Sequence, residues 1–154
     1  MHIFLTGATG HIGSSVLETF LRSGHEVTAL VRDPRKAEVL ARRGVHSVIG
    51  DLSVSASYAG AAEQTDVVVH TALDGSARGE KVDRQAVDTF LAVATKRAAS
   101  GRPAAFVYTS GVWVLGADLA SRLDPTAVGK PDVHDDDVGP CAIGLIDRLA
   151  DGTG

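Results

Sequence analysis

Residues 3–13 read Ile-Phe-Leu-Thr-Gly-Ala-Thr-Gly-His-Ile-Gly, an apolar run that passes directly into a loop with a glycine at every third position. A short run of successive apolar residues is typical of a strand buried on both faces of a parallel sheet. The residues that follow form one apolar helical stripe over about 12–23, with Ile12, Val16, Leu17, Phe20 and Leu21. The stretch therefore predicts a strand, a glycine turn and a helix in immediate succession.

Apolar segments and helical patterns alternate along the next part of the chain. Further strands are expected at 26–31, 45–49, 66–70 and 104–109, and helices from Pro34 onward, near 58–62 and over 79–99. This alternation indicates βαβ units and a parallel sheet. With right-handed crossovers, the five strands take the order 3-2-1-4-5 of a doubly wound, Rossmann-type α/β fold.

The three glycines have distinct expected roles in the loop. Gly7 permits the tight turn out of the strand, and Gly10 lets a pyrophosphate approach the backbone because it lacks a Cβ atom. Gly13 allows the helix to pack closely on the sheet, and the helix N-terminus offers free N–H groups to phosphate. The loop predicts a dinucleotide site, and the alternative is a glycine-rich turn without a ligand.

Residues 6–13 closely resemble the cofactor loop of the short-chain dehydrogenases/reductases. The resemblance is strongest to the extended and atypical group that contains NAD(P)-dependent epimerases and dehydratases. Gly50-Asp51-Leu52, Val69-His70-Thr71-Ala72 and the segment 106–116 match further family segments in the same order. The resemblance covers residues 1 to about 116 and implies an amino-terminal NAD(P)-binding domain.

The resemblance also implies roles for individual residues. Asp51 corresponds to an aspartate that contacts the adenine, and His70-Thr71-Ala72 to a strand end that lines the nicotinamide ribose. The full set of expected cofactor-binding residues is Gly7, Thr9, Gly10, His11, Ile12, Gly13, Arg32, Asp51, Leu52, His70, Thr71, Ala72 and Thr109.

The choice between NADP and NAD depends on the end of the second strand, Val31-Arg32-Asp33. An arginine at this place can neutralise the 2′-phosphate of NADP, whereas an acidic side chain can bond the ribose 2′-OH of NAD. Arg32 comes first, with Arg35 and Lys36 close behind, so the sequence favours NADP. The alternative is that Arg32 is solvated and Asp33 selects NAD.

The catalytic residues of the family are only partly matched. The family arrangement is Ser/Thr–Tyr–Lys, in which a Tyr-x-x-x-Lys pair carries the proton transfer. Four residues after Tyr58 and Tyr108 stand Ala62 and Val112, so that pair is absent. Ser110 is the candidate catalytic hydroxyl, and the alternative is that it caps the strand end or contacts the cofactor.

The apolar pattern weakens after Gly116, and residues 117–154 are expected to form an irregular or partly disordered tail with at most one short helix. Family members continue with a sixth strand, a long helix and a substrate-binding segment. The chain is therefore expected to be truncated relative to the family, and a frameshift or a shortened gene is one explanation. The predicted domains are 1–116 and 117–154.

Three functions fit this sequence. The first is an NAD(P)-binding protein of oxidoreductase ancestry with an atypical active site. The second is a non-catalytic NADP-binding sensor or regulatory module, and the third is a truncated, inactive remnant. The substrate, an unidentified small molecule, is not indicated by any motif.

The composition of the chain bears on its binding partners and on its cellular compartment. The 154 residues carry a net charge of −4, which disfavours nucleic acid, and no metal site is expected. No apolar run approaches the roughly 18 residues that span a bilayer, and Cys141 is the only cysteine. These features predict a cytoplasmic protein. The open edge of the fifth strand predicts a homo-oligomer that associates through residues 107–115.

Overall fold

The computed structural model describes residues 1–102 and 105–109, which belong to one compact unit, Met1–Thr109. Its strands are β1 (His2–Thr6), β2 (Glu26–Val31), β3 (His46–Ile49), β4 (Val67–His70) and β5 (Ala105–Tyr108). Its helices are α1 (His11–Arg22), α2 (Pro34–Ala41), α3 (Ala59–Ala62) and α4 (Gly79–Ala99), with a short 3-10 helix, η1 (Ser55–Ser57). No helix in the described residues is long and apolar enough to cross a membrane.

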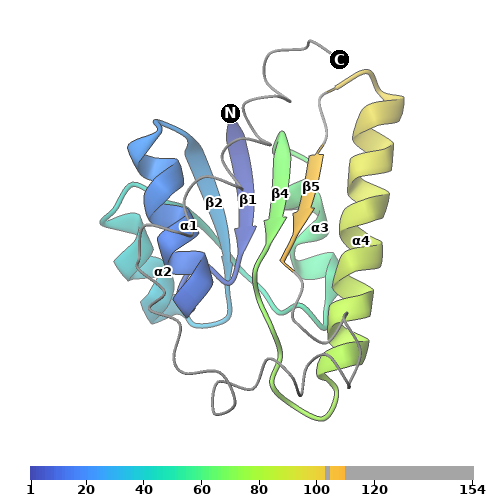
Figure 1. Ribbon diagram of the computed structural model, residues 1–154, viewed down its shortest axis with the longest axis horizontal. Coiled ribbons are helices and arrows are strands. Elements are labelled where there is room, and N and C mark those ends of the chain that lie inside the picture. Colours follow the sequence, from blue (N-terminus) through green and yellow to red (C-terminus); the bar gives the residue numbers. More distant parts are fainter. Residues whose placement is uncertain (103–104, 110–154) are drawn as a thin grey trace, which may run out of the picture. The chain divides into compact units, whose positions relative to one another are not determined.

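The five strands form one parallel sheet in the order β3-β2-β1-β4-β5, which confirms the predicted topology (Figure 1). In the register of the sheet, Thr6 at the end of β1 lies opposite Leu30 of β2 and His70 of β4. The carboxyl ends of the three central strands therefore meet at one edge. The loops that leave them start side by side, which is where ligands bind in open α/β sheets.

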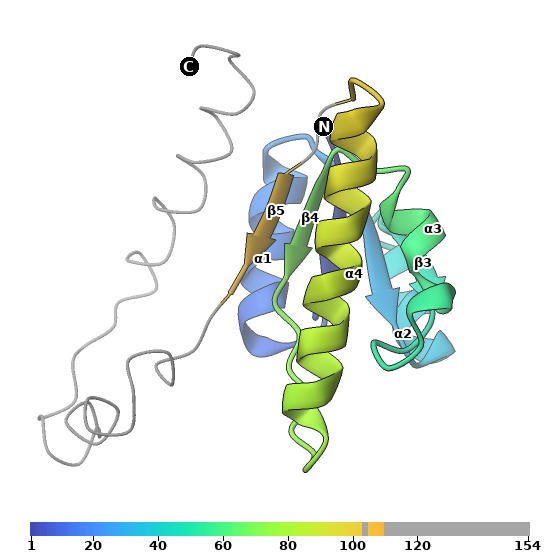
Figure 2. The same ribbon diagram turned by 90° about the vertical axis from the view of Figure 1, so that its right-hand side faces the viewer.

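Helices cover both faces of the sheet, with α1 on one face and α3 and α4 on the other (Figures 1 and 2). Successive side chains of a strand point to opposite faces, so β1 contributes to both cores. Phe4 of β1 packs with Phe90 of α4 at a ring-centroid distance of 6.0 Å, and Tyr58 lies 5.3 Å from the same Phe90 ring. All three rings are buried, and this aromatic group fixes α3 and α4 on the sheet.

The predicted elements are all present, and the differences lie at their ends. The helix predicted over 79–99 has those bounds, whereas α1 begins at His11, one residue before its expected start. Val45 was expected to open the third strand but precedes it. Its N–H donates to the Leu40 carbonyl at 3.1 Å, as part of the turn that leaves α2 through Gly44 at φ +77°. Val45 is thus tied to the helix, although its side chain is buried.

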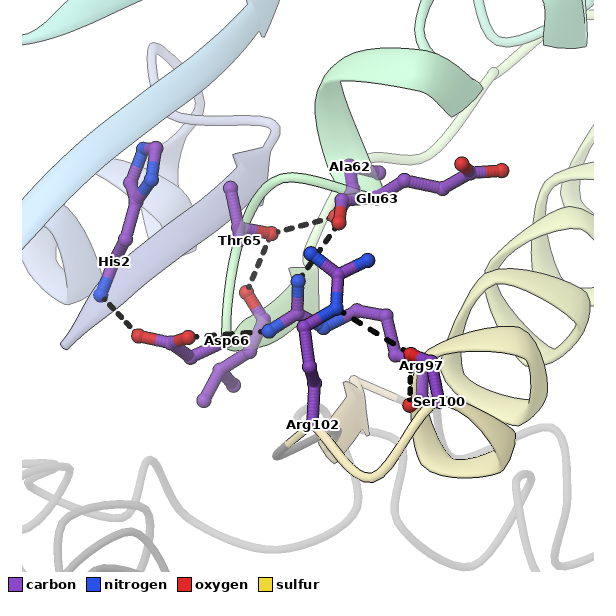
Figure 3. Close-up of polar contacts among 9 residues, drawn as sticks. His2, Ala62, Glu63, Thr65, Asp66, Arg97, Ser100 and Arg102 are labelled. Atoms are coloured by element: carbon purple, nitrogen blue, oxygen red, sulfur yellow. Dashed lines mark hydrogen bonds and ion pairs between the residues drawn. The ribbon is translucent and has the colours of Figure 1, made fainter.

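The amino end of the sheet is closed by the buried side chain of Arg97, near the end of α4 (Figure 3). Its guanidinium donates to the Glu63 carbonyl at 2.7 Å and to Asp66 Oδ1 at 3.2 Å. Asp66 Oδ2 in turn accepts the His2 N–H at 2.9 Å. This arrangement, named here the Arg97 network, joins α4 to the start of β1 and to the turn before β4.

Candidate functional site

A cavity of about 410 Å³ opens at the carboxyl ends of β1, β2 and β4. A cavity of this size lies within the range of small-molecule sites. It is lined by the glycine loop, by the end of β2 and the start of α2, by the turn after β3, and by the segment after β4. The lining residues are Thr6, Gly7, Thr9, Gly10, Leu30, Val31, Arg32, Asp33, Lys36, Gly50, Asp51, Leu52, Thr71, Ala72, Leu73, Asp74 and Val82.

The glycines of the loop meet different surroundings. Gly7 has φ +74°, and a Cβ added to it would lie 2.8 Å from the Ala72 nitrogen. A Cβ on Gly13 would lie 2.1 Å from the Gly7 carbonyl oxygen, so both positions require glycine. A Cβ on Gly10 would meet only the Gly7 oxygen, at 3.2 Å. Gly7 and Gly13 thus shape the loop itself, while Gly10 leaves room on its cavity side.

The N-terminus of α1 differs from that of α2. No side chain caps α1, and its first turn carries no acidic residue. In α2, by contrast, Asp33 Oδ1 accepts the Arg35 N–H at 2.9 Å. The first N–H groups of any helix lack partners within the helix. At α1 these groups stand beside the cavity, and the partial positive charge of the helix end is not offset by a local carboxylate.

Basic side chains occupy the β2 side of the cavity. Arg32 and Lys36 both line it and are exposed. Within the described part of the chain, neither side chain forms a hydrogen bond or an ion pair with another residue, although the charge of Arg32 contributes to lowering the pKa of Asp51 and of Asp74. Asp33 also lines the cavity, but one of its oxygens is committed to capping α2.

Two carboxylates face the cavity from the turns after β3 and β4. The hydroxyl and the N–H of Ser53 both donate to Asp51 Oδ1, at 2.6 and 2.8 Å, and these bonds hold the pKa of Asp51 below its ordinary value. The N–H of Ser76 donates to Asp74 Oδ1 at 2.9 Å and lowers the pKa of Asp74 in the same way. Both side chains are therefore anions at neutral pH.

The end of β4 is held to the end of β1 by hydroxyl groups. Thr71 donates its hydroxyl to the Thr6 carbonyl at 2.8 Å, and the Ala72 N–H donates to Thr6 Oγ1 at 3.3 Å. His70 is fully buried and contacts Thr6 Oγ1 through Nδ1 at 2.5 Å. His70 therefore touches a residue of the cavity wall, but does not line the cavity itself.

The structure brings together most of the residues expected to bind a cofactor. Those that line the cavity are Gly7, Thr9, Gly10, Arg32, Asp51, Leu52, Thr71 and Ala72. Those that do not are His11, Ile12, Gly13, His70 and Thr109, of which the first three form the first turn of α1. Ser110, the candidate catalytic hydroxyl, lies outside the described residues.

Several lining residues were not among those predicted. Lys36 and Asp33 entered the sequence prediction only through the choice between NADP and NAD, Lys36 as a further basic residue and Asp33 as the alternative that selects NAD, and both line the cavity. Asp74 comes from the segment that joins β4 to α4, and Val82 comes from the first turn of α4; no motif marks either residue. Val82 is also buried, and its place in the apolar pattern of α4 indicates only a core role.

A parallel sheet with a glycine loop, an uncapped helix N-terminus and a cavity at its carboxyl edge defines a dinucleotide-binding protein of the Rossmann type. The match to a family model is specific: the model described as NAD(P)H-binding covers residues 7–112. The chain belongs to this NAD(P)H-binding family, as its resemblance to the short-chain dehydrogenases/reductases implied.

The chain matches part of each of two longer curated relatives. An uncharacterized protein of Saccharomyces cerevisiae is 32% identical over 121 residues, which are 75% of this chain and 39% of that protein. An isoflavone reductase homolog of Nicotiana tabacum is 36% identical over 77 residues, which are 45% of this chain and 25% of that protein. The chain thus spans well under half the length of these relatives.

Solved structures of reductases share the fold. Vestitone reductase from alfalfa has a TM-score of 0.52 and 30% identity, over 71% of this chain and 36% of that one. The quinone oxidoreductase QOR2 of Escherichia coli, solved with NADPH, has a TM-score of 0.53 and 25% identity, over 59% of this chain and 33% of that one. The described residues correspond to part of such enzymes.

Proposed function

We propose that this chain binds NADPH as the nucleotide-binding part of an NADP-dependent reductase. The observation that carries the proposal is the single cavity that joins the glycine loop to the exposed cations Arg32 and Lys36. Family membership supports a nicotinamide dinucleotide as the ligand, and the reductases among the similar proteins support the class of reaction. The cofactor, when bound, supplies a hydride for the reduction of a small carbonyl compound.

The pyrophosphate is proposed to lie over Gly10, against the first turn of α1. The space on the cavity side of Gly10 and the uncapped N–H groups of His11, Ile12 and Gly13 support this position. An anion at a helix N-terminus is stabilised both by hydrogen bonds and by the helix dipole. Thr9, which also lines the cavity, offers a hydroxyl at the same place.

The adenosine 2′-phosphate is proposed to lie between Arg32 and Lys36. In the described residues, neither cation's side chain is engaged in a hydrogen bond or an ion pair, whereas Asp33 is already engaged in capping α2. A guanidinium forms charge-assisted bonds with a phosphate, which an uncharged 2′-OH cannot match. This contrast favours NADP over NAD. Asp51 and Leu52 are proposed to contact the adenine.

The nicotinamide end is proposed to lie along Thr71 and Ala72, close to the end of β5. The Thr109 N–H donates to the His70 carbonyl at 3.0 Å, so the chain leaves β5 directly beside the end of β4. Ser110, which lies outside the described residues, is proposed from the sequence resemblance as the hydroxyl that contacts the substrate. His70 is proposed to act behind the cavity wall, because its side chain is buried.

Calorimetric titration of the full chain with NADPH and with NADH tests the proposal. NADPH should bind in the micromolar range and more tightly than NADH. Replacing Arg32→Ala should weaken NADPH binding by about 10- to 100-fold, because a hydrogen bond to a charged group contributes roughly 1.5–3 kcal/mol. NADH binding should change much less.

Arg35→Ala provides the matched control, because Arg35 is an exposed arginine three positions along that does not line the cavity. This variant should bind both nucleotides as the wild type does. Failure of the wild type to bind either nucleotide would overturn the proposed function. Equal losses in Arg32→Ala and Arg35→Ala would show that only the general positive charge between the end of β2 and the start of α2 matters.

A further inference from the structure

A chain of polar contacts runs behind the cavity wall, from α4 to the end of β4. Asp83 of α4 accepts the Tyr108 hydroxyl on Oδ2 at 2.7 Å, and its Oδ1 lies 3.3 Å from His70 Nε2. His70 Nδ1 lies 2.5 Å from Thr6 Oγ1, which accepts the Ala72 N–H at 3.3 Å. The contacts thus join Asp83 to the backbone of a cavity-lining residue.

The direction of each hydrogen bond follows from the chemistry of the groups. Burial lowers the pKa of His70, so its ring is neutral at pH 7 and carries one N–H. The carboxylate of Asp83 can only accept, so the proton belongs on Nε2. Nδ1 is then an acceptor, and the Thr6 hydroxyl must donate to it. This leaves the lone pairs of Thr6 Oγ1 free for the Ala72 N–H.

The surroundings hold His70 and Asp83 in this arrangement. The His70 ring stacks on Tyr108 at a centroid distance of 5.7 Å and lies 5.5 Å from Phe90. The hydroxyl of that same Tyr108 fixes the second oxygen of Asp83. The carboxylate therefore has both oxygens engaged, and it is mostly buried, with 22% of its side chain exposed.

We propose that Asp83 is a positioning residue for the nucleotide site, acting through the tautomer of His70. Asp83 selects the Nε2-protonated ring, the ring orients the Thr6 hydroxyl, and that hydroxyl anchors the Ala72 backbone at the cavity. With the opposite tautomer, the Nδ1–H would donate to Thr6 Oγ1, and the Thr6 hydroxyl would lose the acceptor that fixes its own proton while its two lone pairs served both Nδ1–H and the Ala72 N–H. This role rests on the proposed function, because the anchored segment is the proposed nicotinamide subsite.

Nitrogen-15 NMR of the imidazole in the full chain measures the tautomer without any nucleotide, and calorimetry with NADPH measures its consequence. The wild type should show a protonated Nε2 and a bare Nδ1. Asp83→Leu removes the acceptor, and should move the proton toward Nδ1 and weaken NADPH binding by about tenfold. Asp83→Asn keeps an acceptor oxygen, and should restore the wild-type tautomer and most of the affinity.

Two further variants test the contact of Thr6 and the specificity of the effect of Asp83. Thr6→Val should weaken NADPH binding by a similar factor while the tautomer stays as in the wild type, and it provides the test if Asp83→Leu does not fold. Asp88→Leu alters an exposed aspartate of the same helix, and should change neither measurement.

The outcomes distinguish the two proposals. A bare Nε2 in the wild type, or a tautomer change in Asp83→Leu with unchanged NADPH affinity, would overturn the positioning role alone. Absence of binding by the wild type to both NADPH and NADH would overturn the proposed function, and the positioning role with it.

Discussion

The charged groups at the two ends of the parallel sheet differ in their burial and in their bonding partners. At the amino end, Arg97 is buried and bonded to Glu63 and Asp66, and Asp66 also accepts a backbone N–H from His2 (Figure 3). At the carboxyl end, Arg32 and Lys36 are exposed on the cavity, and their side chains form no hydrogen bond or ion pair with the described residues.

This difference separates stability from binding. A buried charge that lacks partners is strongly destabilising, so the groups of the Arg97 network contribute by satisfying one another. Exposed cations on a cavity contribute little to folding but retain their capacity for an anionic ligand. Substitutions at the amino end should therefore change the free energy of unfolding, and substitutions at the carboxyl end should change nucleotide affinity.

The largest expected effect is on stability, from Arg97→Met. Methionine fills much of the same space, but leaves the Glu63 carbonyl and Asp66 without their donor. The free energy of unfolding should fall by about 3 kcal/mol in urea denaturation, because the bonds to the Glu63 carbonyl and to Asp66 are lost together. NADPH affinity of the folded variant should stay within about twofold of the wild type, because the two ends are distant.

Arg102→Met is the matched control, since Arg102 is exposed and its Nε donates only a long bond, 3.4 Å, to Ser100 Oγ. Its stability should change by less than about 0.5 kcal/mol. A large loss of NADPH affinity in Arg97→Met would mean that the two ends are coupled and that the comparison fails.

Gly13→Ala, at the carboxyl end, should lower both the free energy of unfolding and the nucleotide affinity. The new Cβ would lie 2.1 Å from the Gly7 carbonyl oxygen, so the loop or the helix must move. Overpacking of this kind costs about 1–3 kcal/mol, and the shifted loop should also lose most of its NADPH affinity. Gly60→Ala is the control, because nothing lies within 4 Å of its Cβ position; thermal unfolding should show no loss of stability.

Gly10→Ala should affect binding with little effect on stability. Its Cβ would have only one close neighbour, the Gly7 oxygen at 3.2 Å, which a small adjustment relieves. The methyl group would occupy the proposed path of the pyrophosphate and should weaken NADPH binding by about tenfold. Unchanged affinity in calorimetry, with normal stability, would place the pyrophosphate elsewhere.

The sequence predicted the fold well because local and long-range signals agreed. The apolar strands, the glycine loop and the helical stripe over 12–23 all indicated one topology, and right-handed crossovers allowed one strand order. The error at Val45 is of another kind. A buried valine before a strand follows the same pattern as a strand residue, and only the backbone bond to Leu40 distinguishes the two.

The site was predictable where a motif constrains the backbone and less so where side chains meet across the fold. Gly7 and Gly10 are marked by their spacing, and both line the cavity. The link between Asp83 and His70 joins positions 13 residues apart on a helix and a strand, and no spacing rule relates them. The sequence places Tyr108 in the fifth strand and excludes it from a Tyr-x-x-x-Lys pair, but nothing in it indicates the contact with Asp83.

The smallest expected effect is a pH dependence of stability that originates behind the carboxyl end. Burial lowers the pKa of His70 below its ordinary 6.5, while Asp83 partly opposes the shift. The unfolded chain therefore binds a proton that the folded chain does not, so the stability from His70 is present above pH 6.5 and is lost as the pH falls below it. The free energy of unfolding should decrease by up to about 1.4 kcal/mol per pH unit in this range, and His70→Gln should flatten that slope in urea denaturation at several pH values.

His11→Gln, at an exposed histidine, should leave the slope unchanged. An unaltered slope in His70→Gln would mean that the buried ring does not control acid stability, and that the carboxyl end resembles the amino end in keeping its groups satisfied as the pH falls.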